Sequence, residues 1–192
     1  MLIKSDFEVA QPVDKVWRFF DDVPRVAACL PGAELTDDLG DEQYKGRVSV
    51  RMGPVSLRFA GTAAITERDN SAKRIVVNAT GAEEKGKGQA SMVVSATLLK
   101  AGAGTKVAVR QDLQVSGAAA QYGRGMIADV TSVLMRDFAV NLRDGITRVE
   151  RGESLAQHAA PAKGFRIGLQ ATLMALKRVF RRFFAPYQST VS

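Results

Sequence analysis

The chain has 192 residues, of which 46% are apolar and 24% are charged. This balance is typical of a folded globular domain and excludes a wholly disordered or fibrous chain. The single cysteine, Cys29, excludes an intramolecular disulfide and any metal site built on two cysteines, and the single histidine, His158, excludes a multi-histidine centre. We therefore expect no metal site.

The basic charge is concentrated at the end of the chain. The formal net charge is +7, but residues 154–192 hold six basic side chains and no acidic one. Residues 1–153 hold the other 21 basic and all 20 acidic side chains, so this part is nearly neutral. The charge therefore predicts a neutral body with a cationic tail.

The N-terminus does not have the pattern of an export signal. Lys4, Asp6 and Glu8 interrupt the apolar run that a signal peptide needs. The longest uncharged stretch of the tail, residues 167–176, is also well short of the roughly 20 residues of a membrane-spanning helix. The sequence thus predicts a cytoplasmic protein without a spanning segment.

The beginning of the chain predicts one strand and two short helices. Apolar and charged residues alternate over residues 3–9, which is the period of two of a half-buried strand. Apolar residues then recur at helical spacing over residues 13–20, after Pro12. A second short helix, residues 24–30, is expected to end at Pro31-Gly32.

From there to Gly117 the period of two dominates. The breaks between the alternating runs are short and rich in glycine, which favours an antiparallel meander with one exposed face over a parallel sheet. The predicted strands cover residues 44–52, 57–66, 74–80, 89–98 and 106–115.

After Gly117 the apolar period lengthens to that of a helix, which predicts one long helix from Ala118 to Val149. Its apolar stripe needs an apolar partner, and the inner face of the meander is the surface available. The fold class is therefore α+β: a curved antiparallel sheet wrapped on a long C-terminal helix.

The tail predicts a linker, residues 151–164, an amphipathic helix, residues 165–185, and a disordered end, residues 186–192. The helix carries an aromatic and aliphatic face beside a basic flank, which is typical of binding to an anionic membrane surface. A helix that docks on its own domain and a nucleic-acid-binding segment are the alternatives. The predicted membrane-binding residues are Phe165, Arg166, Leu169, Leu173, Leu176, Lys177, Arg178, Phe180, Arg181, Arg182, Phe183 and Phe184.

Several short motifs occur in a familiar order: PGAE at residues 31–34, GPV at 53–55, Phe59-x-Gly61, Gly86-x-Gly88 and QYGRG at 121–125. Together they resemble the family of the carbon monoxide dehydrogenase G protein, an accessory component of that enzyme, within the START-like (SRPBCC) helix-grip superfamily. The resemblance covers roughly residues 1–150.

The resemblance implies a helix-grip domain, residues 1–150, with an apolar cavity between the sheet and the long helix. It also implies a non-enzymatic accessory role: recruiting a CO dehydrogenase-type molybdenum hydroxylase to the inner face of the cytoplasmic membrane, where electrons pass to quinone. The implied ligand is a menaquinone, a ubiquinone or a lipid, with no covalent cofactor.

Small residues on the inward face of the strands favour such a cavity, and a filled core is the alternative. The predicted cavity is lined by Phe20, Tyr44, Phe59, Ala63, Val77, Ala79, Met92, Val94, Val109, Gln111, Leu113, Tyr122, Met126, Ile127, Val130 and Leu134.

Polar groups are few on the predicted inward face. Gln111 either holds a ligand carbonyl or is a core amide that backbone groups satisfy, and Tyr44 and Tyr122 are similar cases. Catalysis needs convergent acids or bases, which this face lacks. A pocket enzyme of the polyketide cyclase type and a filled-core protein-interaction domain remain the alternative functions. Gly123-x-Gly125-x-x-Ala128 mimics a dinucleotide fingerprint, but an antiparallel sheet lacks the crossover unit that the motif needs.

Overall fold

The computed structural model describes residues 1–153, which form one curved antiparallel sheet and three α-helices. The seven strands lie in the order β1-β7-β6-β5-β4-β3-β2, so the sheet is a meander whose first strand closes beside its last. The strands are β1 (Leu2–Val9), β2 (Ala33–Gly40), β3 (Gln43–Met52), β4 (Val55–Asp69), β5 (Arg74–Glu83), β6 (Gln89–Ala101) and β7 (Gly104–Val115).

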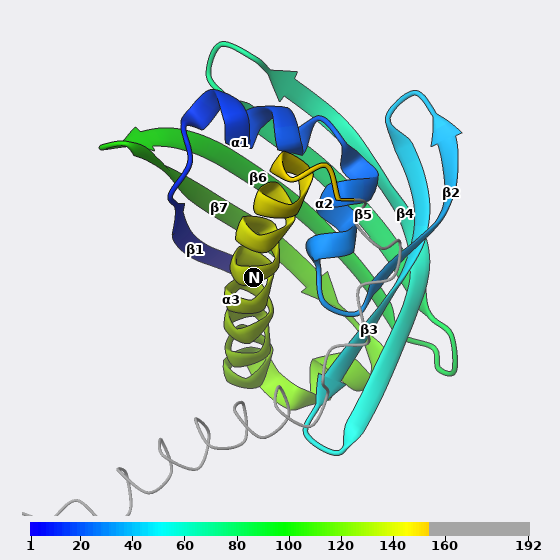
Figure 1. Ribbon diagram of the computed structural model, residues 1–192. Helices are drawn as coiled ribbons and strands as arrows, with labels where there is room; N and C mark the ends of the chain where they lie inside the picture. Colours follow the sequence, from blue (N-terminus) through cyan, green and yellow to red (C-terminus); the bar gives the residue numbers. More distant parts are fainter. Residues whose placement is uncertain (154–192) are drawn as a thin grey trace, which may run out of the picture.

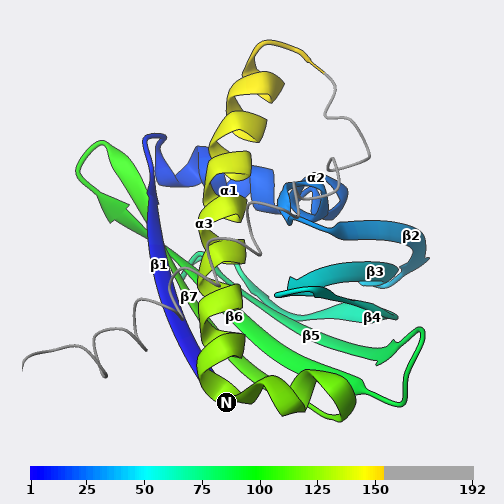
Figure 2. The same ribbon diagram turned by 90° about the horizontal axis from the view of Figure 1, so that it is seen from below.

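The helices cover the concave face of the sheet. The long helix α3 (Gly123–Glu150) crosses this face, and α1 (Val13–Phe20) and α2 (Val23–Cys29) lie beside its C-terminal end (Figures 1 and 2). The predicted fold class is confirmed for residues 1–153. The predicted linker, tail helix and disordered end fall on residues outside the described range, apart from residues 151–153.

One strand was missed by the sequence pattern. β2 lacks a clean alternation because it is an edge strand, and from Thr36 to Gly40 all its residues are exposed. With neither face buried, the strand has no need of alternating apolar residues. The other strands agree with the predictions to within a few residues.

The long helix does not begin at Ala118 as predicted. Residues Gly117–Tyr122 form a 3-10 helix, and α3 starts only at Gly123. Gly123 has a φ of 71°, which glycine adopts without a steric cost, and a β-carbon there would meet nothing within 4 Å. The expectation that this glycine serves a close approach of helix and sheet is therefore wrong, because its role is to change the direction of the chain.

Two separate hydrophobic cores hold the domain together. The first packs α1, α2 and the C-terminal half of α3 on strands β5, β6 and β7, around Val16, Leu142 and Val107. The second packs the N-terminal part of α3 on the β3–β4 hairpin, around Phe59 and Val130. The apolar residues between the two cores form the candidate site.

Within residues 1–153 no helix has both the length and the apolar character needed to cross a membrane.

Candidate functional site

One row of side chains crosses the concave face between the two cores. The strand register places Tyr44, Ala63, Ala79, Met92 and Leu113 opposite one another on β3, β4, β5, β6 and β7. Sequence patterns predicted all five as cavity residues, and each is partly exposed rather than buried. We call this row the inner band.

Small residues lie beside the inner band. The next row toward the second core consists of Gly46, Gly61, Gly81, Ala90 and Val115. Gly61 has a structural reason, because a β-carbon there would lie 1.9 Å from the Thr80 carbonyl oxygen. This glycine lets β4 and β5 approach closely, and the resulting floor has little side-chain volume.

The other predicted cavity residues are divided between the two cores. Tyr44, Ala63, Ala79 and Met92 belong to neither core. In the first core, Phe20 and Val109 are buried, and Val77 and Val94 pack against it. In the second core, Phe59, Ile127 and Val130 are buried, and Leu113, Tyr122, Met126 and Leu134 pack against it. The structure thus leaves a shorter exposed strip than the predicted lining.

Gln111 is the main buried polar side chain beside the inner band. It is only 4% exposed and pairs with Val94 across β6 and β7. Its Nε2 atom donates to the Met135 sulfur of α3 at 3.1 Å. A thioether is a weak acceptor, so this contact is a poor substitute for a carbonyl oxygen. The sequence offered a ligand carbonyl or backbone groups as partners, and the protein instead supplies a sulfur atom.

Ser5 is a polar residue that the sequence reasoning did not single out. It lies on the inward side of β1, opposite Val109, and its hydroxyl oxygen is buried without a hydrogen-bond partner among residues 1–153. The signal was present, because Ser5 is the one polar side chain on the inward face of the first strand. Ser5 and Gln111 therefore form a weakly satisfied polar patch beneath α3.

Tyr44 contributes a hydroxyl at the β3 end of the inner band. Burial, followed by the nearby carboxylates of Asp38 and Glu42, raises the pKa of Tyr44 above its ordinary value. The phenol therefore stays protonated at neutral pH and can donate a hydrogen bond. A second group often considered reactive, Cys29, is buried, and burial together with Asp144 raises its pKa to about 12. Its thiol is therefore a packing group and no nucleophile at neutral pH.

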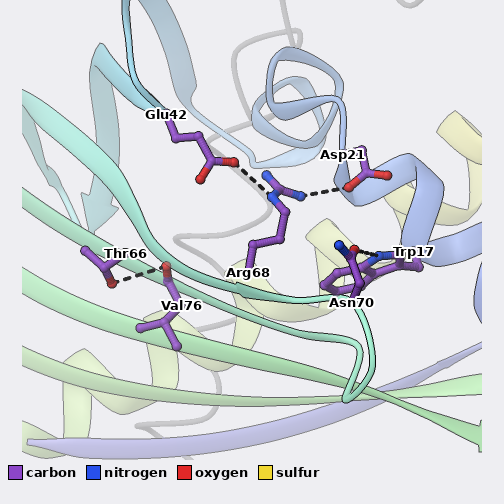
Figure 3. Close-up of polar contacts among 7 residues, drawn as sticks. All are labelled: Trp17, Asp21, Glu42, Thr66, Arg68, Asn70 and Val76. Atoms are coloured by element: carbon purple, nitrogen blue, oxygen red, sulfur yellow. Dashed lines mark hydrogen bonds and ion pairs between the residues drawn. The ribbon is translucent and has the colours of Figure 1, made fainter.

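Polar contacts fix the end of the concave face next to α1 (Figure 3). Arg68 of β4 donates from Nη1 to Asp21 at 2.8 Å and from Nε to Glu42 at 2.9 Å. The Trp17 indole donates to the Asn70 side-chain oxygen at 2.9 Å. Exposed ion pairs contribute only about 0–1 kcal/mol each, so these contacts mainly position α1 and the β2–β3 turn.

The concave face carries little chemistry for catalysis. Among residues 1–153 no group of three or more histidine, cysteine or acidic side chains could hold a metal ion. Glu83 is aligned with Phe59 across β4 and β5, but its carboxylate folds over Gly86 and Gly88 in the β5–β6 loop. The side chains that could meet a ligand by hydrogen bonding are therefore an amide and hydroxyl groups.

Comparison with known families decides the relationship of the chain. A sequence model for the carbon monoxide dehydrogenase G protein (CoxG) matches residues 6–147. The chain belongs to the CoxG family. This confirms the resemblance that the short motifs indicated. No curated protein matches the chain.

Solved structures share the fold. A conserved protein from Geobacillus kaustophilus is 19% identical, with a TM-score of 0.67, covering 77% of this chain and 96% of its own. The Zhui aromatase/cyclase from Streptomyces sp. R1128 is 15% identical, with a TM-score of 0.57 and coverages of 80% and 99%. A START superfamily protein from Mycobacterium smegmatis is 14% identical, with a TM-score of 0.55 and coverages of 77% and 98%. At these identities the likeness shows the START-like helix-grip fold alone.

The predicted membrane-binding residues, Phe165 to Phe184, lie outside the described residues, so the structure does not place them.

Proposed function

We propose that this CoxG-family protein is a non-enzymatic carrier that binds a long apolar molecule with a carbonyl-bearing head, a quinone or a lipid, along the inner band. The observation that carries the proposal is the row of partly exposed apolar residues between two well-packed cores. Each methylene of a ligand tail that leaves water contributes about 0.8 kcal/mol, so an extended tail suits such a row.

The accessory role follows from the family. The proposed partner is a CO dehydrogenase-type molybdenum hydroxylase, which the protein would recruit to the inner face of the cytoplasmic membrane. There the carried quinone would accept the electrons that the hydroxylase releases. The cationic, aromatic pattern of residues 165–184 supports the membrane part of this proposal.

A pocket enzyme of the polyketide cyclase type is less well supported. The fold of the Zhui aromatase/cyclase is shared, but fold likeness does not carry an activity. The inner band offers Tyr44, Gln111 and Tyr122 and no paired acid and base among residues 1–153. A filled-core interaction domain is also disfavoured, because Ala63, Ala79 and Met92 would then be buried rather than partly exposed.

Replacing Gln111 tests whether the ligand head is a carbonyl group. We expect Gln111→Leu to fold normally, because it removes a buried amide whose partner is only a thioether. Affinity for a short-tailed ubiquinone should fall about tenfold through the lost hydrogen bond, while that for a hydrocarbon of the same length should not change. Equilibrium dialysis of both ligands measures the difference.

Gln114→Leu is the matched control, since Gln114 lies on the same strand but points to the outer face. It should change neither affinity. Equal binding of the quinone by the Gln111→Leu variant and the unchanged protein would show that Gln111 does not contact the head group.

A further inference from the structure

The outer face of the sheet carries a hollow of about 580 Å³, on the side opposite the inner band. Leu57 and Phe59 point to the concave face, so alternation sends Ala60 and Thr62 outward, and the same holds along β5, β6 and β7. None of the lining residues is charged. They are Ala60, Gly61, Thr62, Thr80, Gly81, Ala82, Gln89, Ala90, Ser91, Gln114, Val115 and Ser116.

The floor of this outer hollow is made of short side chains that can form hydrogen bonds. The register aligns Thr62, Thr80, Ser91 and Gln114 across four strands. The hydroxyl oxygens of Thr62 and Thr80 lie 3.4 Å apart, and both residues are exposed. A partner can therefore approach the sheet closely and still find donors and acceptors.

Cations border the outer hollow on the β3 side. Lys45 lies opposite Thr62, and Arg58 precedes Ala60 by two residues on the same face. Neither forms an ion pair with any residue of the range 1–153, although Asp37 lies opposite Lys45 on β2. The nearby Arg47 is paired with Glu84 at 3.1 Å. An uncharged centre with a charged border is the usual anatomy of a protein interface.

We propose that the outer hollow is the docking surface for a protein partner that presents a convex, uncharged segment flanked by carboxylates, with Lys45 and Arg58 meeting the carboxylates. The inference rests on the proposed function, since it assigns the surface by which the molybdenum hydroxylase is held. It leaves the concave face free, so the partner and the apolar ligand bind opposite sides of one sheet.

Other occupants match this surface less well. The tail of the chain, residues 154–192, is purely cationic and is repelled by Lys45 and Arg58. A lipid surface is flat and leaves a hollow unfilled. A second copy could offer its acidic β2–β3 turn, where Leu39 is 47% exposed between Asp38 and Asp41, and the test includes this outcome.

The experiment measures binding of the full chain to the purified CO dehydrogenase holoenzyme of the same organism, by biolayer interferometry. Thr80→Arg places a long charged side chain in the centre of the outer hollow and should weaken binding about tenfold or more. Lys45→Glu with Arg58→Glu should also weaken binding and reduce its dependence on salt. Thr36→Arg, an equally exposed threonine on β2, is the matched control and should bind normally.

Each result decides between the two proposals. If the unchanged protein binds the holoenzyme and Thr80→Arg binds equally well, the docking surface is wrong and the proposed function stands. If the unchanged protein does not bind, both are overturned. Self-association in sedimentation velocity that Thr80→Arg and Asp41→Asn both abolish would identify a second copy as the occupant and overturn the inference. Gln114→Arg replaces Thr80→Arg in all assays if the latter fails to fold.

Discussion

Ala79→Phe is expected to yield a folded protein that no longer binds a quinone or a lipid. Ala79 lies in the middle of the inner band, between Ala63 and Met92, and it belongs to neither hydrophobic core. A phenyl ring there occupies the space of the ligand tail. Equilibrium dialysis with a short-tailed ubiquinone should show the loss of binding.

The stability of this variant tests whether the space exists. Overpacking strain should stay within about 1–3 kcal/mol of unfolding free energy, because Ala79 is partly exposed. Ala63→Phe should behave in the same way, and Ala64→Phe, which points outward on the same strand, should keep both stability and binding. Failure of both inner variants to fold would support a filled core. Normal binding by folded inner variants would place the ligand elsewhere.

Removing residues 165–192 is expected to release the protein from anionic vesicles while residues 1–153 stay folded. The deleted segment holds five basic residues, and each contributes about 1 kcal/mol near an anionic surface, so affinity should fall by about a thousandfold. Vesicle sedimentation measures the affinity, and thermal unfolding checks the domain. A truncated protein that still sediments with vesicles would contradict the prediction.

The aromatic residues of the tail give a second, matched comparison. Replacing Phe180, Phe183 and Phe184 with serine keeps every charge, so binding at low salt should persist in part and disappear at high salt. The unchanged protein should weaken at high salt without full release, because the apolar contribution is not screened. Complete release of the unchanged protein at moderate salt would show a purely electrostatic contact.

The main elements of the fold could be predicted because burial on one face imposes a clear period. The inward rows of β3 to β7 and the stripe of α3 follow this rule. β2 could not be predicted, because its residues from Thr36 onward are exposed on both faces and carry no period. The start of α3 was misplaced because apolar periodicity does not record the positive φ of Gly123.

The candidate site was predicted in part for a similar reason. Alternation identified the inward residues, and it placed Tyr44, Ala63, Ala79, Met92 and Leu113 correctly on one face. It could not tell which of them pack into a core, since that depends on where α3 crosses the sheet. The contact of Gln111 with Met135 and the outer hollow also depend on tertiary packing and sheet curvature, which a linear pattern does not encode.

Mass spectrometry of an organic extract of the purified full-length protein tests the central claim most directly. The account predicts a quinone or another long apolar molecule with a carbonyl group, near one molecule per chain, from the unchanged protein and from Ala64→Phe. Ala79→Phe should yield none. An extract of the unchanged protein without such a molecule, together with no uptake of added ubiquinone or lipid, would contradict the account.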